Sequence, residues 1–194
     1  MLRYSMKKLD PKRIENILPL TPLQEGMLFH YLQNPNSEFY FEQLTLEIFG
    51  TIAVDLFEKA WNHVVQANEM LRTAFRWEKL EKPSQVIFKE NPCEIRFHDL
   101  TDIEEERKKE FLVKIKTGDR DEGFDLMCVP FRIILCKLGG IQYEMIISNH
   151  HILYDGWSNG IILKEFFNAY RQLSSGTLFI PPALALTSSR VSKT

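Results

Sequence analysis

The sequence is short of the residues that would place it in several large classes of protein. Among its 194 residues there are only 3 cysteines, Cys93, Cys128 and Cys136, and none is spaced as in a CxxC or zinc-binding pair. We therefore expect reduced, structural thiols and a cytoplasmic location rather than a disulfide framework. No apolar run is long enough to cross a membrane, and the polar stretch from Met1 to Lys12 lacks the apolar core of a signal peptide.

An excess of charge of either sign is also missing. The 24 Lys and Arg side chains are balanced by 26 Asp and Glu side chains, which leaves a formal net charge of −2, and no basic stripe is interleaved with aromatic residues. Nucleic acid is therefore not an expected partner. With 44% hydrophobic residues the chain can bury a sizeable core, and its length fits one domain or one large lobe.

The spacing of the apolar residues predicts a mixed α/β (α+β) lobe, with a mainly antiparallel or mixed sheet and helices packed mostly on one face. Helical spacing and capping signals predict helices over residues 22–32, 54–69, 103–116 and 157–174. Alternation predicts strands over residues 39–50, 71–77, 85–89, 95–97, 131–138 and 141–151. We expect a linker or lead-in over 1–16, the folded lobe over 17–180, and a tail or the start of a linker over 181–194.

The densest group of chemically active side chains lies between the last predicted strand and the last predicted helix, at residues 150–158, with the sequence HHILYDGWS. If the strand continues into this segment, His151 lies at the end of its more apolar face and His150 points elsewhere. Neighbouring strand residues do not easily bind one metal ion, so no metal site is expected. The alternative interpretation of His151 is a core histidine that only satisfies a hydrogen bond.

The helix that follows this segment has a chemical consequence for His151. Ser158 is a good N-cap residue, so the helix is expected to begin beside the histidine. Free amide groups and the partial positive charge at a helix N-terminus disfavour an imidazolium and favour a developing oxyanion. A neutral imidazole beside amide donors suits acyl transfer, in which a nucleophile loses a proton while a carbonyl oxygen gains charge.

The pattern His150-His151-x-x-x-Asp155-Gly156 resembles the HHxxxDG motif of nonribosomal peptide synthetase condensation domains, which belong to the chloramphenicol-acetyltransferase-like superfamily. The continuation into Trp157-Ser158 resembles the DGWS often found there. Three other segments resemble motifs of this family: LTPLQEGMLFH at residues 20–30, LRTAF at 71–75, and FDLMCVPFR at 124–132, where the family has leucine in place of Phe131. The DxxxxD pattern of heterocyclization domains is absent from the sequence.

This resemblance implies an acyltransferase that forms a peptide bond during the biosynthesis of antibiotics and other secondary metabolites. The acceptor is an aminoacyl group and the donor an acyl or peptidyl thioester, each carried on the phosphopantetheine arm of a carrier protein. No cofactor is expected to bind this chain directly. His151 is implied to take or position the proton of the attacking amine, and Gly156 to let the backbone approach the substrate.

The resemblance also implies how the motif is supported. In the family an arginine in the LRTxF segment pairs with the motif aspartate, so Arg72 is expected to hold Asp155. The alternative is that Arg72 is a surface residue of its strand. The other motif residues are expected to support the loop structurally: His150, Trp157 and Ser158.

In the family this length of chain is only the N-terminal lobe. Pro181-Pro182 is a plausible approach to the C-terminal lobe, but residues 183–194 do not resemble the family's continuation. The implied partners are carrier proteins, the missing C-terminal lobe and neighbouring synthetase domains, and self-association through an exposed apolar lobe interface is expected. Alone, the chain is expected to have little or no condensation activity. Three alternatives stay open: a non-catalytic docking lobe for a carrier protein, an epimerization-domain fragment and, least favoured, a metal-dependent hydrolase.

Overall fold

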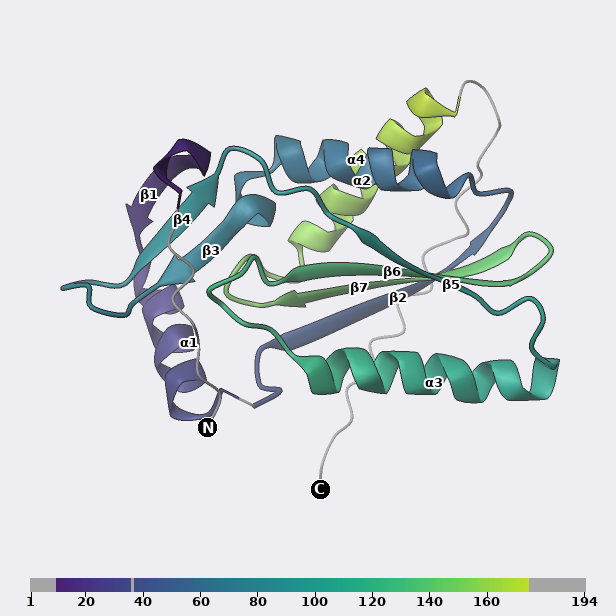
Figure 1. Cartoon of the computed structure of the whole chain (residues 1–194), viewed down its shortest axis with the longest axis horizontal. Coiled ribbons are helices and arrows are strands. Elements are labelled where there is room, and N and C mark those ends of the chain that lie inside the picture. The colour runs from purple at the N-terminus through teal and green to yellow at the C-terminus, as the bar shows by residue number, and fades with distance from the viewer. Residues whose placement is uncertain (1–9, 36, 175–194) are drawn as a thin grey trace.

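The computed structural model describes residues 10–35 and 37–174, and these residues form two β-sheets and four α-helices (Figure 1). The larger sheet has the strand order β2-β7-β6-β5, formed by Phe41–Phe49, Gln142–His150, Phe131–Gly139 and Ile95–Asp99. The smaller sheet has the order β1-β4-β3, formed by Ile14–Pro19, Ser84–Phe88 and Thr73–Arg76. The helices are α1 (Pro22–Gln33), α2 (Val54–Ala67), α3 (Glu105–Glu122) and α4 (Ser158–Leu173). All strand pairs are antiparallel except β5 with β6, so the expected mainly antiparallel sheet is confirmed.

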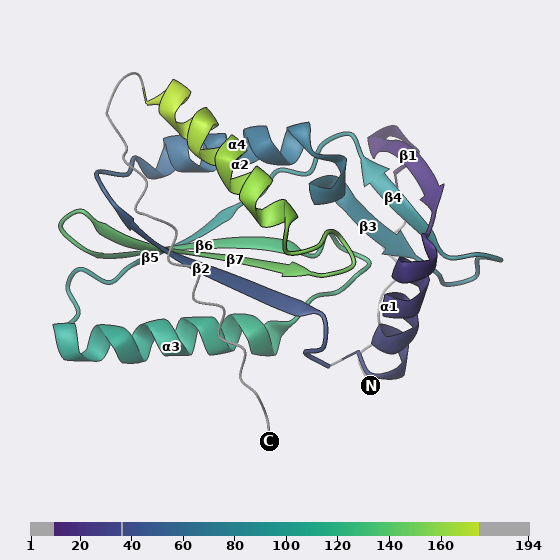
Figure 2. The ribbon, with the colours of Figure 1, turned by 180° about the vertical axis from the view of Figure 1, so that it is seen from behind.

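The helices lie on both faces of the larger sheet (Figures 1 and 2). α2 and α4 cover one face, where Trp61 stacks on Phe166 with ring centroids 4.5 Å apart within the main core. α3 covers the opposite face over a smaller cluster that includes Ile134 and Ile146. The expected packing on one face of the sheet therefore holds for α2 and α4, whereas α3 packs on the opposite face of the larger sheet.

Two helices form for reasons that can be seen in the sequence. The apolar stripe of α2 is buried along its whole length, as its helical spacing predicts. At the start of α1, the Thr21 hydroxyl accepts from the Gln24 amide at 3.3 Å, and the Gln24 side chain accepts from the Thr21 amide at 3.0 Å. This reciprocal capping box satisfies two amides that a helix start otherwise leaves unpaired.

Two boundaries differ from the sequence prediction. Residues 10–16, expected to be lead-in, include a 3-10 turn at Pro11–Arg13 and the start of β1, which pairs with β4. The polar segment 116–122, expected to be a loop, completes α3, because long-range contacts of its acidic side chains outweigh its weak helix propensity. Residues 1–9 and the predicted tail at 181–194 lie outside the described part of the chain.

The long-range contacts that hold the end of α3 to the larger sheet centre on Asp119, which is 3% exposed. Its carboxylate lies 2.5 Å from Nε of Arg132 on β6, and it accepts from the Ser148 hydroxyl on β7 at 2.5 Å and from the Gln43 amide on β2 at 2.7 Å. A buried charge is tolerated only when it is paired and hydrogen-bonded. Asp119 meets that condition and joins α3 to three strands of the larger sheet.

Candidate active site

The two motif histidines lie where β7 ends, and their environments are the reverse of the predicted ones. β7 ends at His150, which is 7% exposed, whereas the side chain of His151 is 31% exposed. The prediction of a buried His151 was wrong because the strand ends one residue too early for its alternation to include that residue. The alternative interpretation, a satisfied core histidine, does not fit a partly exposed side chain either.

His150 is a structural residue of the loop. Its Nδ1 atom accepts a hydrogen bond from the amide of Ile152 at 3.1 Å, and its ring packs against Tyr31 and Tyr40. Burial, with a smaller contribution from the neighbouring charge of His151, lowers the pKa of His150 to about 4. His150 is therefore neutral at physiological pH and accepts the bond that shapes the turn after β7.

The pKa of His150 predicts a loss of stability in acid. The unfolded chain takes up a proton at His150 near its ordinary pKa of 6.5, and the folded chain only near 4. The free energy of unfolding should therefore fall as the pH drops from 6.5 to 4, with a contribution from this group of roughly 3 kcal/mol. Urea unfolding at a series of pH values measures it.

The matched variant for this measurement is His150→Asn, whose side-chain oxygen can replace Nδ1 as acceptor and does not titrate. We expect a shallower loss of stability between pH 6.5 and 4 in His150→Asn than in the unaltered chain. Identical pH profiles of the two proteins would contradict the assignment.

His151 faces a carboxylate that the sequence analysis did not single out. Its Nδ1 atom lies 3.0 Å from Oε1 of Glu42 on β2. Glu42 is opposite Asn149 in the β2–β7 pair, and Asn149 in turn accepts a hydrogen bond from the Tyr154 hydroxyl at 3.0 Å. The signal in the sequence was an acid at the end of the otherwise apolar face of β2, which continues through Leu44.

The loop that carries the motif is fixed at both ends. At its start, the amide of His151 donates to the carbonyl of Tyr40 at 2.8 Å, and the Gln24 side chain donates to the carbonyl of Ile152 at 3.2 Å. At its end, the Asp155 carboxylate accepts from the amide and hydroxyl of Ser158 at 3.3 and 3.2 Å. Asp155 is therefore bonded within the motif loop, to the first residue of α4, and not to Arg72.

The start of α4 differs from the prediction in its free amide groups. The N-cap residue is Trp157, not Ser158. The amides of Ser158, Asn159 and Gly160 donate to the carbonyls three residues before them, at 3.0, 3.4 and 3.3 Å. The amides expected to stabilise an oxyanion beside His151 are therefore already bonded within the first turn.

The predicted ion pair between Arg72 and Asp155 is wrong. Arg72 is 4% exposed, which also excludes the surface alternative, and its guanidinium lies 2.5 Å from the Glu15 carboxylate. The same group donates to the carbonyls of Phe88 and Lys89, in both cases through Nη1. A buried arginine needs an acid partner, and here that partner is Glu15 and not Asp155. Glu15 could not be named from the sequence because β1, which supplies it, was not predicted.

This arrangement predicts which pair of residues is energetically coupled. Arg72→Met should destabilise the lobe by about 1–3 kcal/mol, because the carbonyls of Phe88 and Lys89 lose their donor. A double-mutant cycle with Glu15→Gln should give a coupling energy of roughly 0.5 kcal/mol or more. The cycle of Arg72→Met with Asp155→Asn serves as the control and should be additive. Denaturant unfolding measures both cycles, and coupling only to Asp155 would contradict the structure.

Gly156 and Trp157 extend away from the body of the lobe. A Cβ atom added to Gly156 would meet nothing within 4 Å, so within the described structure no neighbour requires a glycine there. Trp157 is 90% exposed and Ile161, one turn further along α4, is 62% exposed. The expectation that Trp157 supports the loop is not met, because its indole is turned to solvent.

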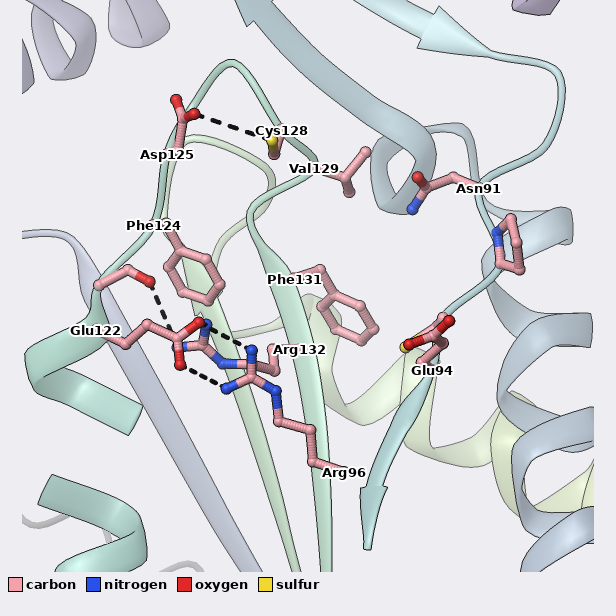
Figure 3. Close-up of a pocket in the computed structure, with 13 residues that line it drawn as sticks. Asn91, Glu94, Arg96, Glu122, Phe124, Asp125, Cys128, Val129, Phe131 and Arg132 are labelled. Carbon is pink, nitrogen blue, oxygen red and sulfur yellow. Dashed lines mark hydrogen bonds and ion pairs between the residues drawn. The ribbon is translucent and has the colours of Figure 1, made fainter. Parts of the chain in front are cut away.

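A pocket of about 460 Å³ lies apart from the motif, between β5, β6 and the loop after α3 (Figure 3). Figure 3 shows two guanidinium groups, those of Arg96 and Arg132, converging on the carboxylate of Glu122. Their charges are already paired, and no residue of the histidine-bearing segment 150–158 lines this pocket, so we do not place the active site there. A smaller hollow of about 210 Å³ includes His150 in its wall.

Neither a metal site nor a membrane-spanning helix is found among the described residues. Across residues 10–35 and 37–174, no three His, Cys, Asp or Glu side chains are grouped so that they could hold a metal ion. Within the same ranges, no helix is both long enough and apolar enough to span a membrane.

Comparison with known proteins places this geometry in a family. Residues 14–184 match the family of condensation domains. The chain is 36% identical over 169 residues to surfactin synthase subunit 2 of Bacillus subtilis (strain 168), and 34% identical over 169 residues to gramicidin S synthase 2 of Brevibacillus brevis. These matches cover 87% of this chain, but only 5% and 4% of the two synthases.

Solved structures agree with the fold. The starter condensation domain of rhizomide synthetase superposes on 86% of this chain with a TM-score of 0.76 at 21% sequence identity, and the match spans 42% of that chain. The first condensation domain of the calcium-dependent antibiotic synthetase, solved with a substrate analogue, gives a TM-score of 0.75 over 89% of this chain and 42% of its own. The chain thus belongs to the condensation domain family of nonribosomal peptide synthetases and has the chloramphenicol-acetyltransferase-like fold.

Proposed function

We propose that this chain supplies the catalytic histidine of a condensation domain that joins an aminoacyl acceptor to an acyl or peptidyl donor. Both substrates are thioesters on the phosphopantetheine arms of carrier proteins. The acceptor amine forms a bond to the donor carbonyl carbon, the carbon–sulfur bond breaks, and the thiolate leaves. His151 takes or holds the proton that the amine loses, and no cofactor bound to this chain takes part.

The observation that carries this proposal is the contrast between the two histidines. His150 is buried, neutral and committed to the turn through Ile152. His151 is partly exposed on a loop that is anchored to α1, β2 and α4. A general base must be held firmly and still be reachable by substrate. Of the two, only His151 combines these properties.

The proposed reaction also depends on chain that lies outside this lobe. The lobe spans 42% of the solved condensation domains named above. Proximity and electrostatic stabilisation both need fixed geometry and excluded water, and a site open to solvent on one side has neither. We therefore expect this chain alone to form little or no peptide bond, and a C-terminal lobe and neighbouring synthetase domains to complete it.

The alternative function is a docking lobe that binds a carrier protein without catalysis. The two functions can be distinguished because only the catalytic one depends on His151. Titration of this chain with a phosphopantetheinylated carrier protein, followed by calorimetry, measures docking. The same carrier loaded with an amino acid is then offered to a condensation domain that contains this lobe. Binding without product in that complete domain favours the docking lobe. Product that disappears in His151→Ala supports the catalytic proposal, and epimerization of the donor in place of condensation supports the third alternative.

The exposed apolar side chains at the start of α4 predict self-association of the isolated chain. Trp157 and Ile161 are four residues apart, so they share one face of the helix. Exposed apolar clusters of this kind mark contact surfaces, and here a C-terminal lobe is the proposed partner. Sedimentation should show concentration-dependent oligomers that dissociate in Trp157→Ser with Ile161→Ser. Lys164→Ser, on an exposed position of the same helix, is the control, and a monomer at high concentration would contradict the prediction.

A further inference from the structure

We propose that Glu42 is a positioning residue that keeps the ring proton of His151 on Nδ1 and so leaves Nε2 free to accept a proton. This inference rests on the proposed function, in which His151 acts on the acceptor amine, and it assigns the group that orients it. Glu42 belongs to none of the motifs identified in the sequence, and it reaches the histidine from β2.

The contact between His151 and Glu42 favours one tautomer of the histidine ring on electrostatic grounds. Nδ1 of His151 is enclosed, and among the described residues it has no aligned hydrogen-bond partner, although Oε1 of Glu42 is only 3.0 Å away. If Nδ1 carried its lone pair, that lone pair would face a carboxylate at this distance, which is repulsive. If Nδ1 carries the proton, a small rotation of the ring turns the same contact into a charge-assisted hydrogen bond. Catalytic hydrogen bonds are often poorly aligned before substrate binds.

The orientation of the Glu42 carboxylate is itself determined by a neighbouring residue. Asn149 lies directly opposite Glu42 in the β2–β7 pair and is 1% exposed. Its Oδ1 atom accepts from the Tyr154 hydroxyl at 3.0 Å, so its Nδ2 group is the one that faces Glu42, at 3.5 Å from Oε2. With one carboxylate oxygen facing an amide donor, the other is directed at His151. Tyr154 belongs to the motif loop and Asn149 to β7, so this hydrogen bond holds the loop and the strand in a fixed relative position.

The other acid of the motif, Asp155, cannot orient the ring of His151. The Asp155 carboxylate is bonded to the amide and hydroxyl of Ser158. The backbone of His151 is bonded to Tyr40, which directly precedes β2 and lies two residues before Glu42, so the ring is held near that carboxylate. A carboxylate on Nδ1 fixes the tautomer and stabilises the imidazolium that forms when Nε2 takes the proton.

The tautomer can be measured directly in the 194-residue chain, without any catalytic assay. Long-range ¹H–¹⁵N correlation spectra of the histidine rings, recorded at a pH high enough to keep them neutral, report which nitrogen carries the proton. Loss of one signal set in His151→Ala assigns the ring. We expect His151 to be protonated on Nδ1 and deprotonated on Nε2. A proton on Nε2 in the unaltered chain would overturn the proposal, whatever the variants do.

Two substitutions on β2 make the test specific. Glu42→Met removes the carboxylate and should move the ring proton of His151 toward Nε2. Glu47→Met makes the same change at an exposed position of the same strand and should leave the spectrum of His151 unchanged. A Glu42→Met spectrum in which His151 keeps its Nδ1 proton would contradict the assignment, as would an equal shift in both variants.

The kinetic consequence is measured in a condensation domain that contains this lobe. The acid of a buried catalytic triad contributes about 10⁴-fold to the rate. The Glu42 side chain is 36% exposed, so its effect should be smaller. We therefore expect Glu42→Met to lower kcat by roughly 10–100-fold with little change in KM. Glu42→Asp should recover part of the loss, and an unchanged kcat in Glu42→Met would overturn the role. Full activity in His151→Ala would instead contradict the proposed function. The tautomer measurement would still test the role of Glu42, because it does not depend on activity.

Discussion

Replacing His151 by alanine in a complete condensation domain should lower the rate of peptide-bond formation by about 10²–10⁴-fold, the range that general acid–base groups contribute. The loss should be in kcat, because the imidazole acts on the proton that is transferred in the transition state and contributes little to binding the carrier-borne substrates. The fold should survive, since the side chain is 31% exposed and its ring packs in no core cluster.

Mass spectrometry of the condensation product, released from its carrier at timed intervals, gives the rate. The control is His63→Ala, which removes an exposed histidine of α2 far along the sequence from the motif. Equal rates for His151→Ala and His63→Ala would show that the histidine has no part in the chemistry. Circular dichroism on each variant separates a loss of catalysis from a loss of fold.

Replacing Asp119 by asparagine should cost about 3 kcal/mol of the free energy of unfolding, the lower end of the range for breaking a buried ion pair, because Arg132 then keeps only the half-exposed Glu122 as a charge partner. The asparagine has nearly the same shape, so the effect reports the charge and its hydrogen bonds rather than a cavity. The Ser148 hydroxyl and the Gln43 amide, which also bond this carboxylate, would be left to share a neutral group.

Urea unfolding followed by circular dichroism measures this cost. Asp121→Asn is the matched control, since Asp121 is exposed on the same helix two residues later and should change stability by no more than about 0.5 kcal/mol. A loss in Asp119→Asn as small as that of the control would contradict the account of how α3 is held to the sheet.

The parts of the fold that could be predicted from the sequence are those in which a local pattern and the tertiary packing agree. The stripe of α2 and the capping box of α1 need only near neighbours in the sequence to be recognised. The hairpin of β6 and β7 has strong alternation and a Gly139-Gly140 turn, where both glycines adopt positive φ. β1 has no buried residue, so no apolar alternation marked it as a strand.

For the candidate site, the sequence suggested individual residues but not the contacts that they make. The motif identified His151, but the burial of its side chain depends on where β7 ends. The pairing of β2 with β7 does not extend past His150. Arg72 needed an acid, and only the position of β1 determines that this acid is Glu15. Glu42 is 109 positions from His151 in the sequence and reaches it only through the β2–β7 register.

The most direct test of the central claim compares peptide-bond formation by this chain alone with formation by the same lobe joined to a C-terminal lobe, using one donor thioester and one aminoacyl acceptor on their carrier proteins. The account predicts no product above background for the chain alone, and product that depends on His151 once the second lobe is present. Robust product from the chain alone, or product from the joined lobes that survives His151→Ala, would contradict it.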